Sequence, residues 1–340
     1  MPEKQPNVMS KLEMSAFSPN ALKYNFEAKR INADQSFEGI YSSFQDDMVR
    51  VERVGERFKV EADSDETGLL GEALIFKLLE EGALGVKTTA RGTNKYDDFF
   101  KGADIVIESI SSQQRDPVIA GIDVTVSQEA VGEQKRNFFE ANGAVPEIGL
   151  EKKLGRIKRH VDLLASYSPK QAIEISAWLQ SGGFLQPKTD FNRQKFEEAE
   201  KVLLLKYYKT PQTSENPNKP DFVIAGPQIV LSVDRSFINK VFHGNQQEKA
   251  LKDISTIIQI EVPFAVAALT KYIGEIKERK GSNLLLDMTH AASRAWELTF
   301  TQEVSQMRIQ RALQECSRDR QLMEQVNLYQ KAVTSALKVK

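Results

Sequence analysis

The sequence is poor in cysteine and histidine, with one Cys and three His in 340 residues. A disulfide framework and a zinc site built from several cysteines are therefore excluded. Cys316 lies in an Arg-rich segment with a helical pattern, where we expect a structural thiol rather than a nucleophile. His160, His243 and His290 are too scattered to suggest one metal site, and we expect each to be structural or on the surface.

Long apolar runs and an excess of one charge are also missing. The longest uncharged apolar run, residues 262–270, is much shorter than the about 20 residues of a membrane span. The N-terminus is polar and lacks the apolar segment of a signal peptide. We therefore expect a cytoplasmic protein with no membrane partner. Because 46 Lys and Arg nearly cancel 47 Asp and Glu, any binding to nucleic acid must come from local patches.

The chain has the composition of a globular protein, with 41% hydrophobic and 27% charged residues. Its length suggests about two domains. No P-loop, G-x-G-x-x-G or G-x-S-x-G motif is present, so the common phosphate-binding and nucleophile motifs are excluded.

Hydrophobic spacing predicts an α/β protein: a small mixed β-sheet flanked by helices, with a helical N-terminal arm and a helical C-terminal region. Ser18 and Pro19 are typical of a helix start. β-branched runs bounded by polar turns predict strands. The predicted strands are residues 85–89, 102–108, 117–126, 222–225 and 228–233. The predicted boundaries are 1–65 for the arm, 66–240 for the α/β core with a helical insertion at about 150–210, and 241–340 for the C-terminal helices.

Three acidic residues are candidates for binding a metal ion or for catalysis. Glu72 lies on the predicted helix after residue 65, Asp104 opens one strand, and Asp123 lies in the middle of its neighbour. Residues opposite each other on antiparallel strands have Cβ atoms about 5 Å apart, so two carboxylates can share a cation. Mg²⁺ favours one or two carboxylates together with water and substrate phosphate oxygens.

This order resembles the PD-(D/E)xK nuclease superfamily, over about half of the chain (residues 66–235). The similar segments are Gly71-Glu72-Ala73, Ala103-Asp104-Ile105-Val106-Ile107 and Gly121-Ile122-Asp123-Val124-Thr125. The resemblance implies a restriction-endonuclease-like core and hydrolysis of phosphodiester bonds. Asp104 and Asp123 would hold Mg²⁺ or Mn²⁺ with help from Glu72.

The sequence departs from the superfamily at Thr125, which stands where the motif has a lysine. A threonine can bind water but supplies no positive charge to the transition state. Lys135 is the predicted replacement, with Lys101 and Lys95 as less favoured choices. Without a replacement, the fold would be a catalytically inactive binder.

Each acidic residue also has a simpler interpretation. Asp104 could be a solvated carboxylate at the start of a strand, and Glu72 an ordinary surface residue. Asp123 interrupts an apolar run, so it should have a metal, a cation or a hydrogen-bond donor beside it. Other acids compete for the same role; they are Asp97, Asp98 and Glu108.

A basic segment on a predicted helix is the expected nucleic-acid contact. Positive charge there attracts phosphates, although a solvated helix face has the same pattern. Its members are Lys152, Lys153, Arg156, Lys158 and Arg159. Apolar residues of the C-terminal helices need burial and could form a homo-oligomer contact.

The leading hypothesis is a metal-dependent nuclease acting on DNA or RNA. One alternative is an inactive nucleic-acid-binding protein with the same fold, and another is a helical scaffold or adaptor. Strand parity separates them, because the metal hypothesis fails if Asp104 and Asp123 point to opposite faces of the sheet.

Overall fold

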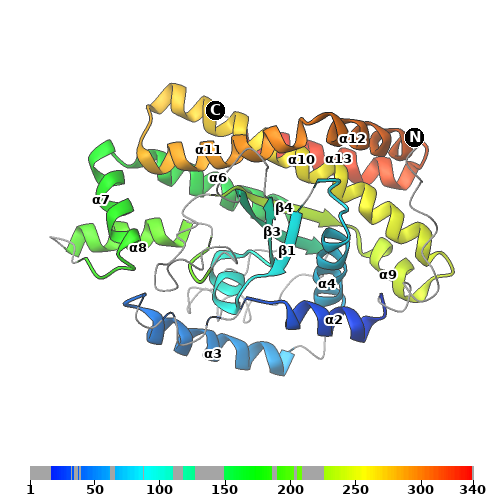
Figure 1. The fold of residues 1–340 in the computed structure, drawn as a ribbon, viewed down its shortest axis with the longest axis horizontal. Coiled ribbons are helices and arrows are strands. Elements are labelled where there is room, and N and C mark those ends of the chain that lie inside the picture. The colour runs from blue at the N-terminus through cyan, green and yellow to red at the C-terminus, as the bar shows by residue number, and fades with distance from the viewer. Residues whose placement is uncertain are drawn as a thin grey trace.

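A four-stranded sheet lies at the centre of the computed structural model (Figure 1). The structure describes residues 17–31, 33, 37, 40–61, 66–86, 88–109, 118–126, 149–185, 190–202, 205–208 and 226–338. The strands, in spatial order, are β1 (Thr88–Gly92), β2 (Ile105–Ser109), β3 (Val118–Val126) and β4 (Gln228–Val233). The first three run antiparallel, whereas β4 is parallel to β3.

Helices flank the sheet, which confirms the predicted mixed sheet flanked by helices. The helices of the N-terminal arm lie below it in Figure 1, and the C-terminal helices lie above it. The helices are α2 (Pro19–Ala28), α3 (Phe44–Glu61), α4 (Glu66–Glu80), α6 (Leu150–Ser166), α7 (Pro169–Gln180), α8 (Asp190–Val202), α9 (Arg235–His243), α10 (Gln247–Lys280), α11 (Leu284–Phe300), α12 (Glu303–Cys316) and α13 (Arg320–Ala336). A one-turn π-helix, η3 (Asp97–Lys101), joins β1 to β2.

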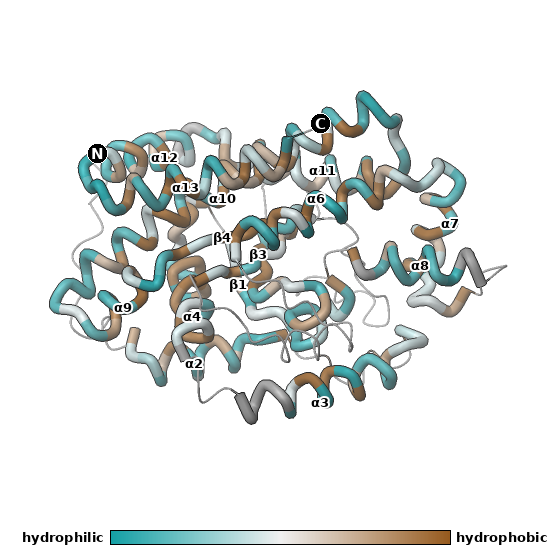
Figure 2. Tube along the Cα trace, turned by 180° about the vertical axis from the view of Figure 1, so that it is seen from behind, coloured by the Kyte–Doolittle hydropathy of each residue, from teal (hydrophilic) through white to brown (hydrophobic). Residues whose placement is uncertain are grey.

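Local sequence signals account for several of these boundaries. Ser18 caps α2 by accepting a hydrogen bond from the Ala21 N–H, and Pro19 is its first residue, as predicted. β1 and β2 begin later than predicted, and Asp104 immediately precedes β2 instead of opening it. Every residue of β3 is buried, because α4 packs against it and β2 and β4 flank it. In Figure 2, α4 is largely brown, as expected for a helix in the core.

Side chains from the C-terminal helices form hydrogen bonds with backbone groups of β4, which is an edge strand of the sheet. The Tyr329 hydroxyl donates to Val230 O at 2.5 Å, and Gln325 Nε2 donates to Ser232 O at 2.8 Å. The Ser232 N–H donates to Glu261 on α10 at 3.1 Å. Because an open sheet edge carries unpaired N–H and C=O groups, these contacts attach the C-terminal region firmly to the core.

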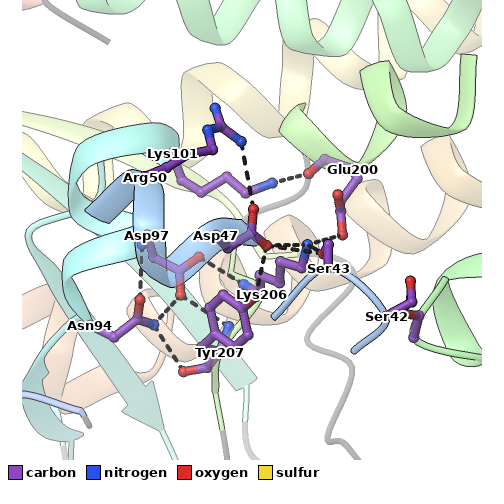
Figure 3. A network of polar contacts seen from close by, with 11 residues as sticks. Ser42, Ser43, Asp47, Arg50, Asn94, Asp97, Lys101, Glu200, Lys206 and Tyr207 are labelled. Atoms are coloured by element: carbon purple, nitrogen blue, oxygen red, sulfur yellow. Dashed lines mark hydrogen bonds and ion pairs between the residues drawn. The ribbon is translucent and has the colours of Figure 1, made fainter. Parts of the chain in front are cut away.

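The N-terminal arm is attached by a buried ion-pair network (Figure 3). Asp47 on α3 accepts hydrogen bonds from Lys206 Nζ at 2.8 Å and from the Tyr207 hydroxyl at 2.7 Å. The Lys206 ammonium also lies near three tyrosine rings, at 5.6, 5.4 and 5.7 Å from the centroids of Tyr41, Tyr96 and Tyr207. A cation over aromatic faces is stabilised further when water is excluded.

Helix α10 is the one described helix with the length and hydropathy of a membrane span. In its apolar window, 67% of the residues are buried inside the protein, and core helices of soluble proteins pass the same test. The helix continues through Pro263, which lies inside it.

Candidate functional site

Asp104 and Asp123 lie on the same face of the sheet. Ile105 pairs with Ile122, so continuing this register by one residue brings Asp104 level with Asp123. The core confirms this parity. Ile105 and Ile122 belong to the main hydrophobic cluster, whereas Val106 packs in a separate cluster on the other face. Since side chains alternate along a strand, Asp104 and Asp123 share the face of Val106.

The carboxylate of Asp123 is buried between two cations from α6. Its Oδ1 accepts from Lys153 Nζ, and its Oδ2 accepts from Arg156 Nη2. Only 3% of the Asp123 side chain is exposed. Lys153 Nζ also donates to Val124 O at 3.0 Å. Burial disfavours the charged lysine, but Asp123 and Asp104 outweigh it and raise the pKa of Lys153.

Asp104 is buried beside this pair. Its Oδ2 accepts from the Val124 N–H at 2.7 Å, beyond the last ladder pair of β2 and β3. Burial, together with the negative charges of Asp123 and Asp98, raises the pKa of Asp104 to about 8. Asp104 is therefore not the solvated carboxylate of the simpler interpretation.

Two further acids lie around Asp104. Glu72 on α4 is half-buried, and burial, reinforced by Asp104 and Asp98, raises its pKa well above the usual range. Asp98 accepts from Arg30 Nη1 at 2.8 Å, and burial still raises the pKa of Asp98. Arg30 reaches it because the Ile31 N–H donates to Gly92 O at 2.8 Å and ties the arm to β1.

The lysine that contacts Asp123 is Lys153, which the sequence analysis did not predict as the replacement for the motif lysine. Lys135, the predicted replacement for the motif lysine, lies outside the described residues. Lys101 points away from the site and donates to Glu200 O, and Lys95 is exposed. Lys153 was assigned only to nucleic-acid binding. The signal that could have indicated it is its three-residue spacing from Arg156, which puts both on one face of α6, the next described helix after β3.

Of the remaining residues predicted from the sequence, Thr125 lies at the site, whereas Asp97 and Glu108 make structural contacts. The Thr125 hydroxyl is buried and has no hydrogen-bond partner among the described residues. It shares the face of Asp123, two residues away. Asp97 accepts from the backbone N–H groups of Lys206 and Tyr207 at 2.8 and 3.2 Å, and Glu108 accepts from the Tyr208 hydroxyl.

The predicted basic segment is divided by the way α6 packs. Lys153 and Arg156 turn inward to Asp123, whereas Lys152 and Arg159 are exposed. Lys158 is half-buried and donates to the main-chain oxygen of residue 338 at 2.9 Å. The outward positive surface of this helix is therefore smaller than its sequence suggests.

The residues fit a small hard cation. Within the part of the chain that the structure describes, no three His, Cys, Asp or Glu side chains form a metal site by themselves. Mg²⁺ and Mn²⁺ do not require three, because water and substrate oxygens complete the coordination. The ammonium of Lys153 already stands in for a cation, between Asp123 Oδ1 and Val124 O and beside Asp104. The site therefore contains oxygen atoms of the kind that bind metal ions, around a position that a positive charge occupies.

Comparison with protein-family models, with curated proteins and with solved structures finds no match to this chain. The function must therefore be argued from the geometry of the site alone.

Proposed function

We propose that this chain is a divergent PD-(D/E)xK nuclease with a restriction-endonuclease-like core that hydrolyses phosphodiester bonds in nucleic acid with Mg²⁺ or Mn²⁺. The observation that carries the proposal is the contact of Lys153 with Asp123, on the face of the sheet that also holds Asp104. This contact puts a positive charge from α6 beside Asp123, on the face of the sheet that also carries Thr125. The element order α4, β1, η3, β2, β3, α6, α7, α8, β4, in which a helix precedes three antiparallel strands and further helices precede the last strand, supports it as well.

Each residue then has a defined role. Asp104 and Asp123 would hold the metal ion, which supplies an activated water and offsets the charge of the phosphate. Glu72 would act as a further ligand of the metal ion or orient that water. Lys153 would place its positive charge beside the reacting phosphate, where Thr125 cannot.

The test is cleavage of labelled single- and double-stranded DNA and RNA with Mg²⁺ or Mn²⁺. Asp123→Asn keeps the shape of the side chain and one oxygen that can accept from Lys153 or Arg156, so it disturbs the buried site less than Asp123→Ala, although both remove the negative charge. Asp46→Asn, an exposed position on α3, is the matched control. We expect metal-dependent cleavage by the wild type and the control, and none by Asp123→Asn. Cleavage that survives Asp123→Asn in the folded variant would contradict the proposal.

A second candidate is a nucleic-acid-binding protein without the reaction. It is favoured by the pairing of both Asp123 oxygens, because a chain that never releases these cations holds no metal. This candidate predicts binding that weakens steeply with salt and does not depend on Asp123. Lys152→Ala should reduce the slope of affinity against salt by about one. A scaffold, the third alternative, would neither cleave nor bind.

A further inference from the structure

The two cations beside Asp123 are held in different ways. Arg156 is 5% exposed, and besides Asp123 it donates to Gly102 O at 3.4 Å. Lys153 is 16% exposed and sits at the end of a flexible four-carbon chain. The guanidinium is therefore the more deeply buried partner of Asp123, and the ammonium is the more accessible and more flexible one.

The backbone around Gly102 keeps Arg156 in place. Gly102 has a φ of 65°, and a Cβ there would lie 2.3 Å from Arg156 Nη1. Gln228 Nε2 donates to Gly102 O at 2.9 Å and to Lys101 O at 3.0 Å. The guanidinium thus lies in a space shaped for it, on a turn that β4 holds in position.

Lys153 occupies a position that oxygen atoms define. A carboxylate oxygen of Asp123 and the main-chain oxygen of Val124 both accept from Nζ, and Asp104 lies beside them. Carboxylate and carbonyl oxygens are also the ligands of hard divalent cations. An ammonium and a divalent cation cannot share this space.

We propose that Lys153 occupies the divalent cation's place in the resting protein, and that a phosphodiester draws its ammonium away from Asp123. This inference rests on the proposed function. Metal ion and nucleic acid then bind together, because the phosphate takes over the ammonium and frees the oxygens for the metal. Linkage requires that each ligand strengthens the other by the same factor. Arg156 remains on Asp123 throughout and keeps its carboxylate in place.

Binding of Mn²⁺ tests this without any catalytic step. Free Mn²⁺ is measured by electron paramagnetic resonance during titration of the full chain in the absence of nucleic acid. We expect Lys153→Gln to bind Mn²⁺ at least about tenfold more tightly than the wild type. Lys170→Gln, which removes an exposed lysine on α7, should bind like the wild type.

A second titration contains a phosphorothioate-linked oligonucleotide, in DNA and RNA form, with the Mn²⁺ bound by the oligonucleotide alone subtracted. We expect it to tighten Mn²⁺ binding to the wild type but not to Lys153→Gln. Binding that is lost in Asp123→Asn, yet equal in the wild type and Lys153→Gln, would overturn this inference and leave the proposed function standing. If no folded variant binds Mn²⁺ through Asp123 under either condition, both fail.

Discussion

The guanidinium of Arg156 occupies the space that a side chain on Gly102 would need. An added Cβ would lie 2.3 Å from Nη1 and 2.6 Å from Nη2. The two residues are far apart in the sequence, so this contact joins the turn before β2 to α6 and aligns the cation with Asp123.

Gly102→Ala should therefore lower the free energy of unfolding by more than the cost of backbone strain alone. A left-handed conformation costs a residue with a Cβ about 1 to 2 kcal/mol, and the displaced guanidinium leaves Asp123 poorly paired. Gly82→Ala is the matched control, because Gly82 has a φ of 81° and open space around its Cβ position. Chemical denaturation of both variants measures the difference. Equal losses would show that Arg156 tolerates the added methyl group.

Lys153→Gln should reduce cleavage by about 100-fold or more, because a positive charge beside the phosphate is lost. Lys170→Gln, at an exposed position on α7, should leave the rate nearly unchanged. Single-turnover cleavage under saturating metal measures both. A folded Lys135→Gln variant that loses activity, while Lys153→Gln keeps it, would return the role to the residue predicted from the sequence.

The buried Glu261 should make stability depend on pH. Burial raises its pKa well above the usual range, so the folded state retains a proton that the unfolded state releases. Stability should then fall as pH rises above about 4.5, until the pKa of the folded state is passed. Glu261→Gln, which resembles the protonated form, should flatten this fall. Melting temperatures from pH 5 to 9 provide the test, and parallel curves for the two proteins would contradict it.

Lys206→Met should destabilise the N-terminal arm strongly. The ammonium pairs with Asp47 and with Glu200 at 2.8 and 2.7 Å, and its removal takes the most deeply buried cation away from Asp47, which keeps the hydroxyls of Tyr207 and Ser43 and the half-buried Arg50. Breaking a buried pair costs about 3 to 5 kcal/mol. Arg193→Met, at an exposed pair with Glu197, should cost less than about 1 kcal/mol. Urea denaturation compares them, and similar losses would mean that the network of Figure 3 contributes little.

The sequence predicted the elements better than their contacts. β2, β3 and β4 were recognisable because β-branched residues fill them between polar turns. The need of Asp123 for a partner also followed from its apolar surroundings. Which basic side chain contacts Asp123 depends on how α6 packs against β3, and the spacing of residues along the helix does not determine this packing.

The adjacent residues Asp97 and Asp98 show the same limit. Asp97 accepts from the Lys206 N–H, 109 residues away, whereas Asp98 accepts from Arg30 in the N-terminal arm. In sequence they are equivalent acids in one turn. Their partners come from two distant segments, residue 206 and the N-terminal arm. Tertiary contacts therefore decide which partner each acid has.

The sealed edge of β4 has a consequence for synthesis on the ribosome. Gln325, which binds Ser232, follows it by 93 residues. At about 5 to 20 residues per second, the strand emerges roughly 5 to 20 s before the helix that covers it. During that interval the carbonyl groups of Val230 and Ser232 lack the Tyr329 and Gln325 side chains that bind them in the folded protein, and a chaperone that shields strand edges would have its binding site there.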